Sequence, residues 1–349
     1  MNKSCLIGFL MCSAFSLVVQ AATDGAHITK TISQIERKKG IKRTIQYRPD
    51  GNDFVCVNGK NRYTRALYGG ITDFRIETSD RPVFAAYKPK DSKHICFRLQ
   101  CGNQSIALDS LKFCEARYRA GRRTYRLTDP LLGKGELNIS VLAFPDAEGG
   151  IWRFTMKDMP EGALLHCYIS EIRAKNLSRN GDMGADRADS FDAPQLPKEQ
   201  KHYKLSLDGT TAYIVVEDQE LRLPALVEGT SLYDKSEKWR SEIESSLQIS
   251  TPDPYFNPLG GALAAAADGI WDGKIWLHGA IGWRSQLNGW RAAYIGDFIG
   301  WHDRARTHFD SYAASQVTDV PATIPHPTQD TALHLARSVK KWGTPHYSN

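Results

Sequence analysis

The residues of this chain that are best suited to chemistry gather between positions 251 and 317. This stretch holds five of the eight tryptophans, with Arg, Asp, His and Gly among them. They are Trp271, Trp276, Trp283, Trp290 and Trp301. An ordinary core is built from Leu, Ile and Val with few charges beside the rings. A pyranose has an apolar face and a rim of hydroxyl groups, so this mixture favours sugar binding. Packing of the tryptophans between helices is the alternative.

A single helical face would bring several of these groups together. On one continuous helix from about Leu287 to Gln316, six aromatic or polar residues share a face. They are Trp290, Tyr294, Asp297, Trp301, His308 and Tyr312. Gly296 and Gly300 each weaken a helix by about 1 kcal/mol relative to alanine, so a break with Asp297 as a cap is the alternative. Asp297 is the candidate for acid–base chemistry or for binding a sugar hydroxyl. A cap or an ion pair with an arginine is its structural interpretation.

Two Gly-Trp-Arg triplets add cations beside the rings, at Arg284 and Arg291. A guanidinium can bind paired oxygens while the neighbouring ring stacks on a sugar, and a structural cation–π pair is the alternative. Asp303 would point away from its neighbour His302 on a helix, so His302 is assigned to ligand contact or support rather than to base catalysis. The candidate sugar-binding residues are Trp283, Arg284, Trp290, Arg291, Tyr294, Trp301 and His302.

Several other chemistries lack their motifs in this sequence. It contains no serine-hydrolase elbow, Walker loop, dinucleotide fingerprint, zinc-protease motif or Cys-x-x-Cys pair. The formal net charge of +6 is too small to indicate nucleic-acid binding, although it suits an acidic polysaccharide. We expect neither a metal nor a cofactor. The odd set of cysteines beyond the N-terminal segment predicts mostly buried free thiols, with a Cys96–Cys101 disulfide left open. These cysteines are Cys56, Cys96, Cys101, Cys114 and Cys167.

The N-terminus has the residue order of a secretory signal peptide. Lys3 precedes an apolar run from Cys5 to Val19, and small residues follow it. The run is shorter than the roughly 20 apolar residues that a membrane span needs, and no second apolar segment follows. Lipid anchoring at Cys12 is the alternative. We expect residues 1–22 to be cleaved and the protein to be exported to the periplasm, the outer membrane or the extracellular space.

The middle of the chain reads as strands followed by helices. Residues 44–230 alternate short extended segments with turns, which predicts a large β-sandwich domain over residues 23–233. An Asp-rich stretch at 176–200 is interpreted as a loop. Residues 234–250 are predicted to form a linker helix, because Trp239, Ile243 and Leu247 recur every four residues.

Residues 251–349 are predicted to be helical. Asp253 and Pro254 are suited to an N-cap and the first helical position, and the small residues of GGALAAAADGIW continue that helix. A second helical stretch covers Leu287 to Gln316. A third covers Thr331 to Trp342, before Gly343.

Taken together, these features resemble the secreted bacterial six-hairpin glycosidases, with the α-L-rhamnosidase-like enzymes as the nearest comparison. The resemblance rests on PYFNPLGGALAAAADGIW, LHGAIGWR, LNGWRAAYIGDFIGWHDRAR and HFDSYAASQ. It implies an (α/α)6 toroid behind the sandwich and a glycoside hydrolase acting on a plant or host polysaccharide. Six hairpins need about twelve helices of about 11–12 residues, and only about three fit here. We therefore expect an incomplete toroid, an N-terminal fragment that has no efficient turnover alone.

Two further functions stay open. A polysaccharide lyase with a helical toroid would use Tyr294, His308 and Arg291 to remove a proton beside a uronate carboxylate. A non-catalytic carbohydrate-binding protein would use the aromatic and arginine residues alone. An ultraviolet-absorbing product would identify the lyase, a new reducing end the hydrolase, and binding without turnover the third. In each case the expected partner is an oligo- or polysaccharide.

Overall fold

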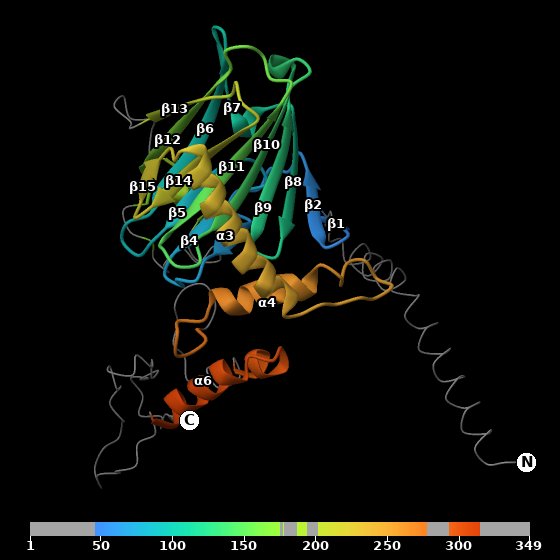
Figure 1. Cartoon of the computed structure of the whole chain (residues 1–349), viewed down its shortest axis with the longest axis vertical. Helices are drawn as coiled ribbons and strands as arrows, with labels where there is room; N and C mark the ends of the chain where they lie inside the picture. Colours follow the sequence, from blue (N-terminus) through green and yellow to red (C-terminus); the bar gives the residue numbers. More distant parts are fainter. Residues whose placement is uncertain (1–45, 175–176, 178–186, 194–201, 278–292, 315–349) are drawn as a thin grey trace, which may run out of the picture.

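Two antiparallel sheets form the body of the molecule, and the helices follow them in the chain (Figure 1). The computed structural model describes residues 46–174, 177, 187–193, 202–277 and 293–314. The eight-stranded sheet consists, in spatial order, of β1 (Arg48–Asp50), β2 (Asp53–Val57), β8 (Phe113–Arg119), β9 (Arg122–Thr128), β10 (Glu136–Ala143), β11 (Gly149–Lys157), β14 (Thr211–Glu217) and β15 (Glu220–Arg222). The seven-stranded sheet consists of β13 (His202–Ser206), β12 (Leu164–Glu171), β6 (Lys93–Cys101), β5 (Val83–Tyr87), β4 (Arg75–Thr78) and β3 (Arg65–Tyr68), with β7 (Gln104–Ala107) paired to β6.

The main core lies between the two sheets. Successive side chains of a strand point to opposite faces, so each strand contributes every second residue to this core. In β6, for example, Ile95, Phe97 and Leu99 are almost completely buried. Phe84 and Trp152, from opposite sheets, meet edge to face with ring centroids 5.6 Å apart. Three short 3₁₀ turns connect strands, at Leu108–Ser110, Pro130–Leu132 and Ala188–Phe191.

Helix α3 (Leu226–Ser245) lies across the outer face of the eight-stranded sheet, over β14, β11 and β10 (Figure 1). Its buried residues are Gly229, Tyr233, Ser236 and Arg240. Tyr233 packs into a second apolar cluster on that face with Leu142, Ile151, Tyr213 and Val215. The Tyr233 hydroxyl is 2.7 Å from the Ser140 hydroxyl, which fixes the helix on the sheet.

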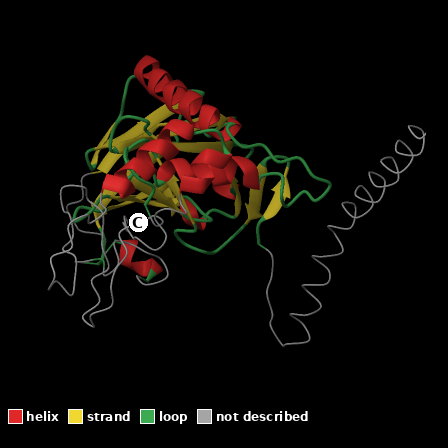
Figure 2. Cartoon of the chain, turned by 90° about the horizontal axis from the view of Figure 1, so that it is seen from below, coloured by secondary structure: helices red, strands yellow, loops and turns green. Residues whose placement is uncertain are grey.

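The helices after α3 gather at one end of the sandwich, as Figure 2 shows from below. Helix α4 (Leu259–Gly269) packs against α3 and the edge strand β3. Residues 293–298 form a short helix, and α6 (His302–Ala314) follows it. Among the described helices, none is long and apolar enough to cross a membrane.

The prediction of two β-layers followed by helices is confirmed in this coarse form, whereas the toroid stays a prediction. The predicted signal peptide (1–22) and third helix (331–342) lie outside the described residues. All five described cysteines are free, and Cys56, Cys114 and Cys167 are buried, as the sequence predicted.

The predicted helix positions need correction. Helix α3 begins at Leu226 rather than at 234, because Gly229 fits closely against the Tyr213 ring and Tyr233 anchors the first turns. Its buried face is therefore not the one that Trp239, Ile243 and Leu247 define. Helix α4 begins only at Leu259.

Two further outcomes concern the predicted helix cap at Asp253 and the predicted helix from Leu287 to Gln316. Asp253 does not cap a helix, because its side chain accepts the Tyr255 amide hydrogen bond in a preceding turn. In the described part of the stretch from Leu287 to Gln316, the alternative of a broken helix is the one observed, with the break at residues 299–301. There Gly300 has a φ of +88°, a conformation that favours glycine.

A pocket between the sandwich and the helices

The structure describes only part of the site that the sequence predicted. Trp283, Arg284, Trp290 and Arg291 lie outside the described residues. Tyr294, Asp297, Trp301 and His302 are described, and the helix break between them changes their relation. Tyr294 is 56% exposed, whereas His308 is fully buried. The prediction that these two residues share one helical face is therefore wrong.

Trp276 is a core residue rather than a binding residue. Its side chain is 1% exposed, and its indole N–H donates to the carbonyl oxygen of Ala267 at 2.9 Å. Its backbone N–H donates to Nδ1 of His308 at 3.0 Å, which explains the burial of that histidine. A Cβ atom placed on Gly296 would lie 2.0 Å from the Trp276 ring, so only glycine allows this contact.

Arg304 joins two other tryptophans to a carboxylate. Its guanidinium carbon lies 4.6 Å from the Trp301 ring centroid and 5.8 Å from that of Trp271. Its Nη1 donates to Oδ1 of Asp268 at 2.7 Å. Rings of Trp271 and Trp276 are 4.6 Å apart. We call Trp271, Trp276, Trp301 and Arg304 the tryptophan cluster, and its contacts are those of cation–π and ring packing.

Asp297 and His302 are within hydrogen-bonding distance of each other on the surface. Oδ1 of Asp297 lies 2.7 Å from Nδ1 of His302, and the side chains are 66% and 68% exposed. The Asp297 carbonyl also accepts the Gly300 amide at the helix break. Neither side chain is enclosed as an acid–base group in an active site would be. The described partner of the Asp297 carboxylate is thus a histidine and not the arginine that its structural interpretation predicted.

A pocket of about 240 Å³ lies where the sandwich meets α3 and α4, and we call it the junction pocket. Four elements contribute to it: β3, the end of the β8–β9 hairpin, α3 and α4. Its lining residues are Thr64, Arg65, Ala66, Tyr68, Tyr118, Ala120, Gly121, Trp239, Arg240, Ile243, Ala265, Ala266 and Asp268.

Three aromatic side chains from three elements line this pocket: Tyr68 on β3, Tyr118 on β8 and Trp239 on α3. No ring–ring contact joins them in the described part of the chain, so they enclose space instead of packing on one another. Burial raises the pKa of both tyrosines, which keeps their hydroxyls protonated as neutral hydrogen-bonding groups.

A network of polar and aromatic side chains next to the pocket holds Arg65, a cation that lines it. The Arg65 guanidinium carbon lies 5.8 Å from the Tyr118 ring centroid and 4.8 Å from that of Tyr47. The Tyr47 hydroxyl accepts a hydrogen bond from Arg123 at 2.9 Å and donates to Asp80, both of which are completely buried. Arg65 is therefore supported from the sandwich core.

Asp268 supplies the carboxylate of the pocket, from the end of α4. It is 7% exposed, and burial raises the pKa of its carboxyl while Arg304 opposes the increase. Arg304 binds Oδ1, and the described residues provide no hydrogen-bond partner for Oδ2. Asp268 thus contacts the tryptophan cluster through Arg304 and also lines the junction pocket.

Reasoning from the sequence missed most of this pocket. Tyr68, Tyr118 and Asp268 were not among the candidates, and Trp239 was interpreted only as part of an apolar helix face. One signal was available, because Asp268 is the only charged residue in the small-residue helix LGGALAAAADG. A charge within such an apolar segment needs a partner or a role.

Comparison with known families adds one match. Residues 89–216, which include β6 to most of β14, match a family model described as "Domain of unknown function (DUF4450)". The match covers less than half of the chain and includes neither α3 nor α4. No curated protein matches the chain.

Proposed function

We propose that this chain binds a saccharide in the junction pocket, as the sugar-binding part of an exported carbohydrate-active protein. The observation that carries the proposal is the enclosure of one space by Tyr68, Tyr118 and Trp239, with the Asp268 carboxylate at its wall. Aromatic rings stack on the apolar face of a sugar. The carboxylate and Arg65 are suited to its hydroxyl groups.

The size of the pocket favours a short ligand. Pockets for drug-sized molecules have volumes of about 300–1,000 Å³, and the junction pocket holds about 240 Å³. One sugar residue, or the end of a longer chain, fits this space better than the middle of a polymer does.

Binding is better supported than hydrolysis. Glycoside hydrolases use two carboxyl groups about 5–10 Å apart, and Asp268 is the only carboxyl group among the described residues that line the pocket. One observation does favour hydrolysis as the second candidate: a buried carboxyl with a raised pKa is suited to the role of general acid. A glycoside hydrolase would need its second carboxylate from other residues.

The described structure does not bring the residues of the lyase alternative together. Tyr294 is exposed while His308 is buried against Trp276, so these two groups do not face a common ligand. Arg291 lies outside the described residues. We therefore do not propose a lyase.

The experiment that tests the proposal fills the pocket without removing any contact. Ala266 on α4 lines the pocket and is exposed, so Ala266→Leu should fold normally and occupy the sugar space. Ala262→Leu on the same helix lies outside the pocket and is the matched control. Calorimetry with neutral monosaccharides and aryl glycosides should show binding that Ala266→Leu weakens by at least about tenfold. Equal binding by both variants, or no binding by the wild type, would contradict the proposal.

A further inference from the structure

A second surface with ligand-binding chemistry lies on the outer face of the seven-stranded sheet. Because Leu165 and Cys167 of β12 point into the core, the alternate residues His166 and Tyr168 point outward. In the register of the sheet, His166 lies opposite Arg98 of β6 and Lys204 of β13.

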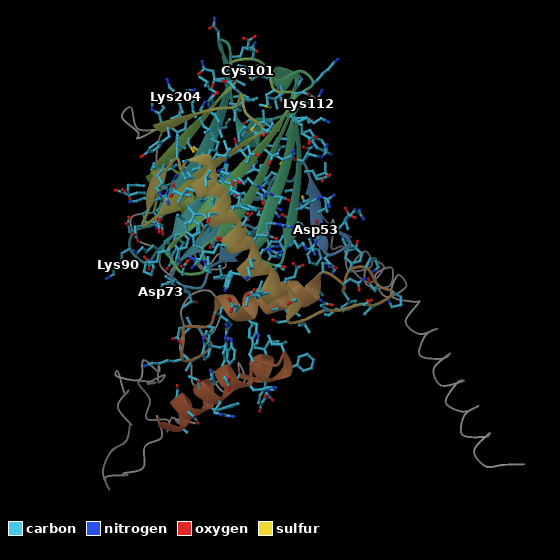
Figure 3. The ribbon with its side chains drawn as sticks, viewed as in Figure 1. Asp53, Asp73, Lys90, Cys101, Lys112 and Lys204 are labelled. Carbon is cyan, nitrogen blue, oxygen red and sulfur yellow. The ribbon has the colours of Figure 1, made fainter. Side chains whose placement is uncertain are left out.

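Tyr168 lies opposite His202, which completes the group. We call Arg98, His166, His202 and Lys204 the basic face. Figure 3 labels Lys204 near the end of the sandwich that lies away from α4 and α6. The basic face is therefore separate from the junction pocket.

The cations of the basic face have no carboxylate partners among the described residues. Arg98 donates to the hydroxyl and carbonyl oxygens of Ser105, both at 3.3 Å. His166 Nε2 lies 2.7 Å from the side-chain oxygen of Gln100. No ion pair of Lys204 or His202 exists in the described part of the chain.

The described carboxylates near this face are engaged by other groups. Burial and then the nearby charge of Asp109 raise the pKa of Cys96, and Asp109 pairs with Arg62 at 3.2 Å. Glu171 binds Lys93 at 2.6 Å, and Asp208 accepts a hydrogen bond from Ser206. Within the described ranges, none of these carboxylates pairs with a member of the basic face.

The outer face of the eight-stranded sheet provides a comparison for these cations without carboxylate partners. There Arg117 pairs with Glu115 at 2.8 Å, and Arg126 lies 3.3 Å from Glu136. Arg122 pairs with Glu237 of α3 at 2.7 Å. These three arginines have carboxylate partners, while Arg153 on the same face stacks on the Tyr233 ring instead. Among the described residues, the cations of the basic face have neither a carboxylate partner nor a covering α-helix.

Aromatic rings lie among these cations. The rings of His166, Tyr168 and His202 are within 19–25° of parallel, with centroids 5.7–6.5 Å apart. Such a group offers ring surface and hydrogen-bonding edges beside the positive charges. A sugar polymer that bears carboxylates would match both features.

We propose that the basic face binds an acidic polysaccharide, with Arg98 and Lys204 contacting its carboxylates and the rings of Tyr168 and His202 contacting its sugars. His166 is only 9% exposed and acts through its charge. A uronate polymer is favoured over a nucleic acid. Only four basic side chains make up the face, whereas a nucleic-acid site needs a longer stripe of Lys and Arg along the phosphates. This site is independent of the saccharide proposed for the junction pocket.

His166 makes this binding depend on pH. Burial, and then the charges of Lys204, His202 and Arg98, lower the pKa of His166, so this imidazole is neutral at pH 7. The titratable or charged groups that face it are Arg98 and Cys96 on β6, His202 and Lys204 on β13, and Tyr168 on its own strand. A bound carboxylate offsets the repulsion between these cations and raises the pKa of His166. Binding therefore takes up protons and becomes tighter as the pH falls.

The test measures binding of oligogalacturonate by the whole chain at low salt, near pH 5.5 and near pH 7.5, by calorimetry. Figure 3 labels two exposed lysines for matched variants, Lys204 on the basic face and Lys112 elsewhere. Lys204→Gln should weaken binding roughly three- to tenfold, and Lys112→Gln should leave it within about twofold. Binding should be tighter at the lower pH, and an NMR titration should show the pKa of His166 rising when ligand is present.

Several results would overturn the proposal. They are equal affinity for a neutral dextran oligomer, tighter binding of a DNA oligonucleotide, an equal loss in Lys112→Gln, and absence of binding at pH 5.5. The Ala266→Leu variant separates the two sites, because it blocks the junction pocket and should leave oligogalacturonate binding unchanged. Loss of oligogalacturonate binding in Ala266→Leu would place that ligand in the pocket and refute the basic face.

Discussion

The junction pocket and the tryptophan cluster are neighbours built from the same kinds of side chain, and both use Asp268. In the cluster, the Trp271 and Trp276 rings are 4.6 Å apart and Gly296 closes the remaining space. In the pocket, Tyr68, Tyr118 and Trp239 come from three elements and enclose about 240 Å³. A high content of aromatic and arginine residues therefore does not distinguish a packed core from a binding pocket. Both regions also contain a close glycine–ring contact, Gly296 with Trp276 and Gly269 with Tyr68. What distinguishes them is that the rings of the cluster contact one another, whereas those of the pocket leave space between them.

The largest effect is expected where packing is closest. Trp276→Ala should lower the free energy of unfolding by about 3–5 kcal/mol, the usual cost of removing a buried Trp side chain. Its ring is 1% exposed, and two hydrogen bonds hold the residue. Urea unfolding measures the change. A loss below about 1 kcal/mol would mean that the cluster is not a core.

A smaller loss of stability is expected at the glycine that closes the cluster. A methyl group at Gly296 would meet the Trp276 ring at 2.0 Å, so Gly296→Ala should cost about 1–3 kcal/mol through overpacking. Gly209 is the control, since its nearest neighbour would be 3.9 Å away. Thermal unfolding of the two variants compares them directly, and equal melting temperatures would show that Trp276 moves freely.

In the junction pocket, a substitution should change sugar affinity more than it changes stability. Trp239 lines open space and is half-buried, so Trp239→Ala should lower sugar affinity about tenfold or more with a stability loss near 1 kcal/mol. Phe298→Ala is the control, an aromatic truncation outside the pocket at a residue that is 78% exposed. Calorimetry and urea unfolding on the same samples separate affinity from stability. A variant that loses stability but not affinity would assign Trp239 to the core.

The smallest effect concerns the carboxylate that both regions share. Burial raises the pKa of Asp268 above its ordinary value of 3.8, so the folded state binds the proton more tightly than the unfolded state does. Ionised Asp268 therefore lowers stability progressively as the pH rises above 3.8 toward the folded-state value. The unfolding free energy of Asp268→Asn relative to wild type should increase over that range. A relative decrease would mean that the Arg304 ion pair outweighs the cost of burial.

The sandwich could be predicted from the sequence because the alternation of core-facing and outward-facing residues along a strand is visible in neighbouring positions. In β6, the order Ile95, Phe97, Leu99 already identifies the core face. The free cysteines could be predicted for a similar reason, since their number and spacing matched no shared site. The start of α3 could not, because Gly229 and Thr230 favour a helix only through contact with Tyr213.

The junction pocket could not be predicted either, because its walls are distant in the chain. Tyr68, Tyr118 and Trp239 come together only through the packing of β3, β8 and α3. Trp276, one of the tryptophans singled out in the sequence, packs in the core. The close contact between Gly296 and its ring shows this role. The basic face has the same origin, since His166 and His202 meet through strand pairing.

The most direct test of the central claim follows the indole N–H signals of Trp239 and Trp276 by NMR during titration with neutral monosaccharides and aryl glycosides. Trp239 lines the pocket, whereas the Trp276 indole is bound to Ala267 inside the core. We expect the Trp239 signal to shift in a saturable manner and the Trp276 signal to stay in place. A stationary Trp239 signal with every saccharide, or equal shifts of both signals, would contradict the assignment of the junction pocket as the sugar site.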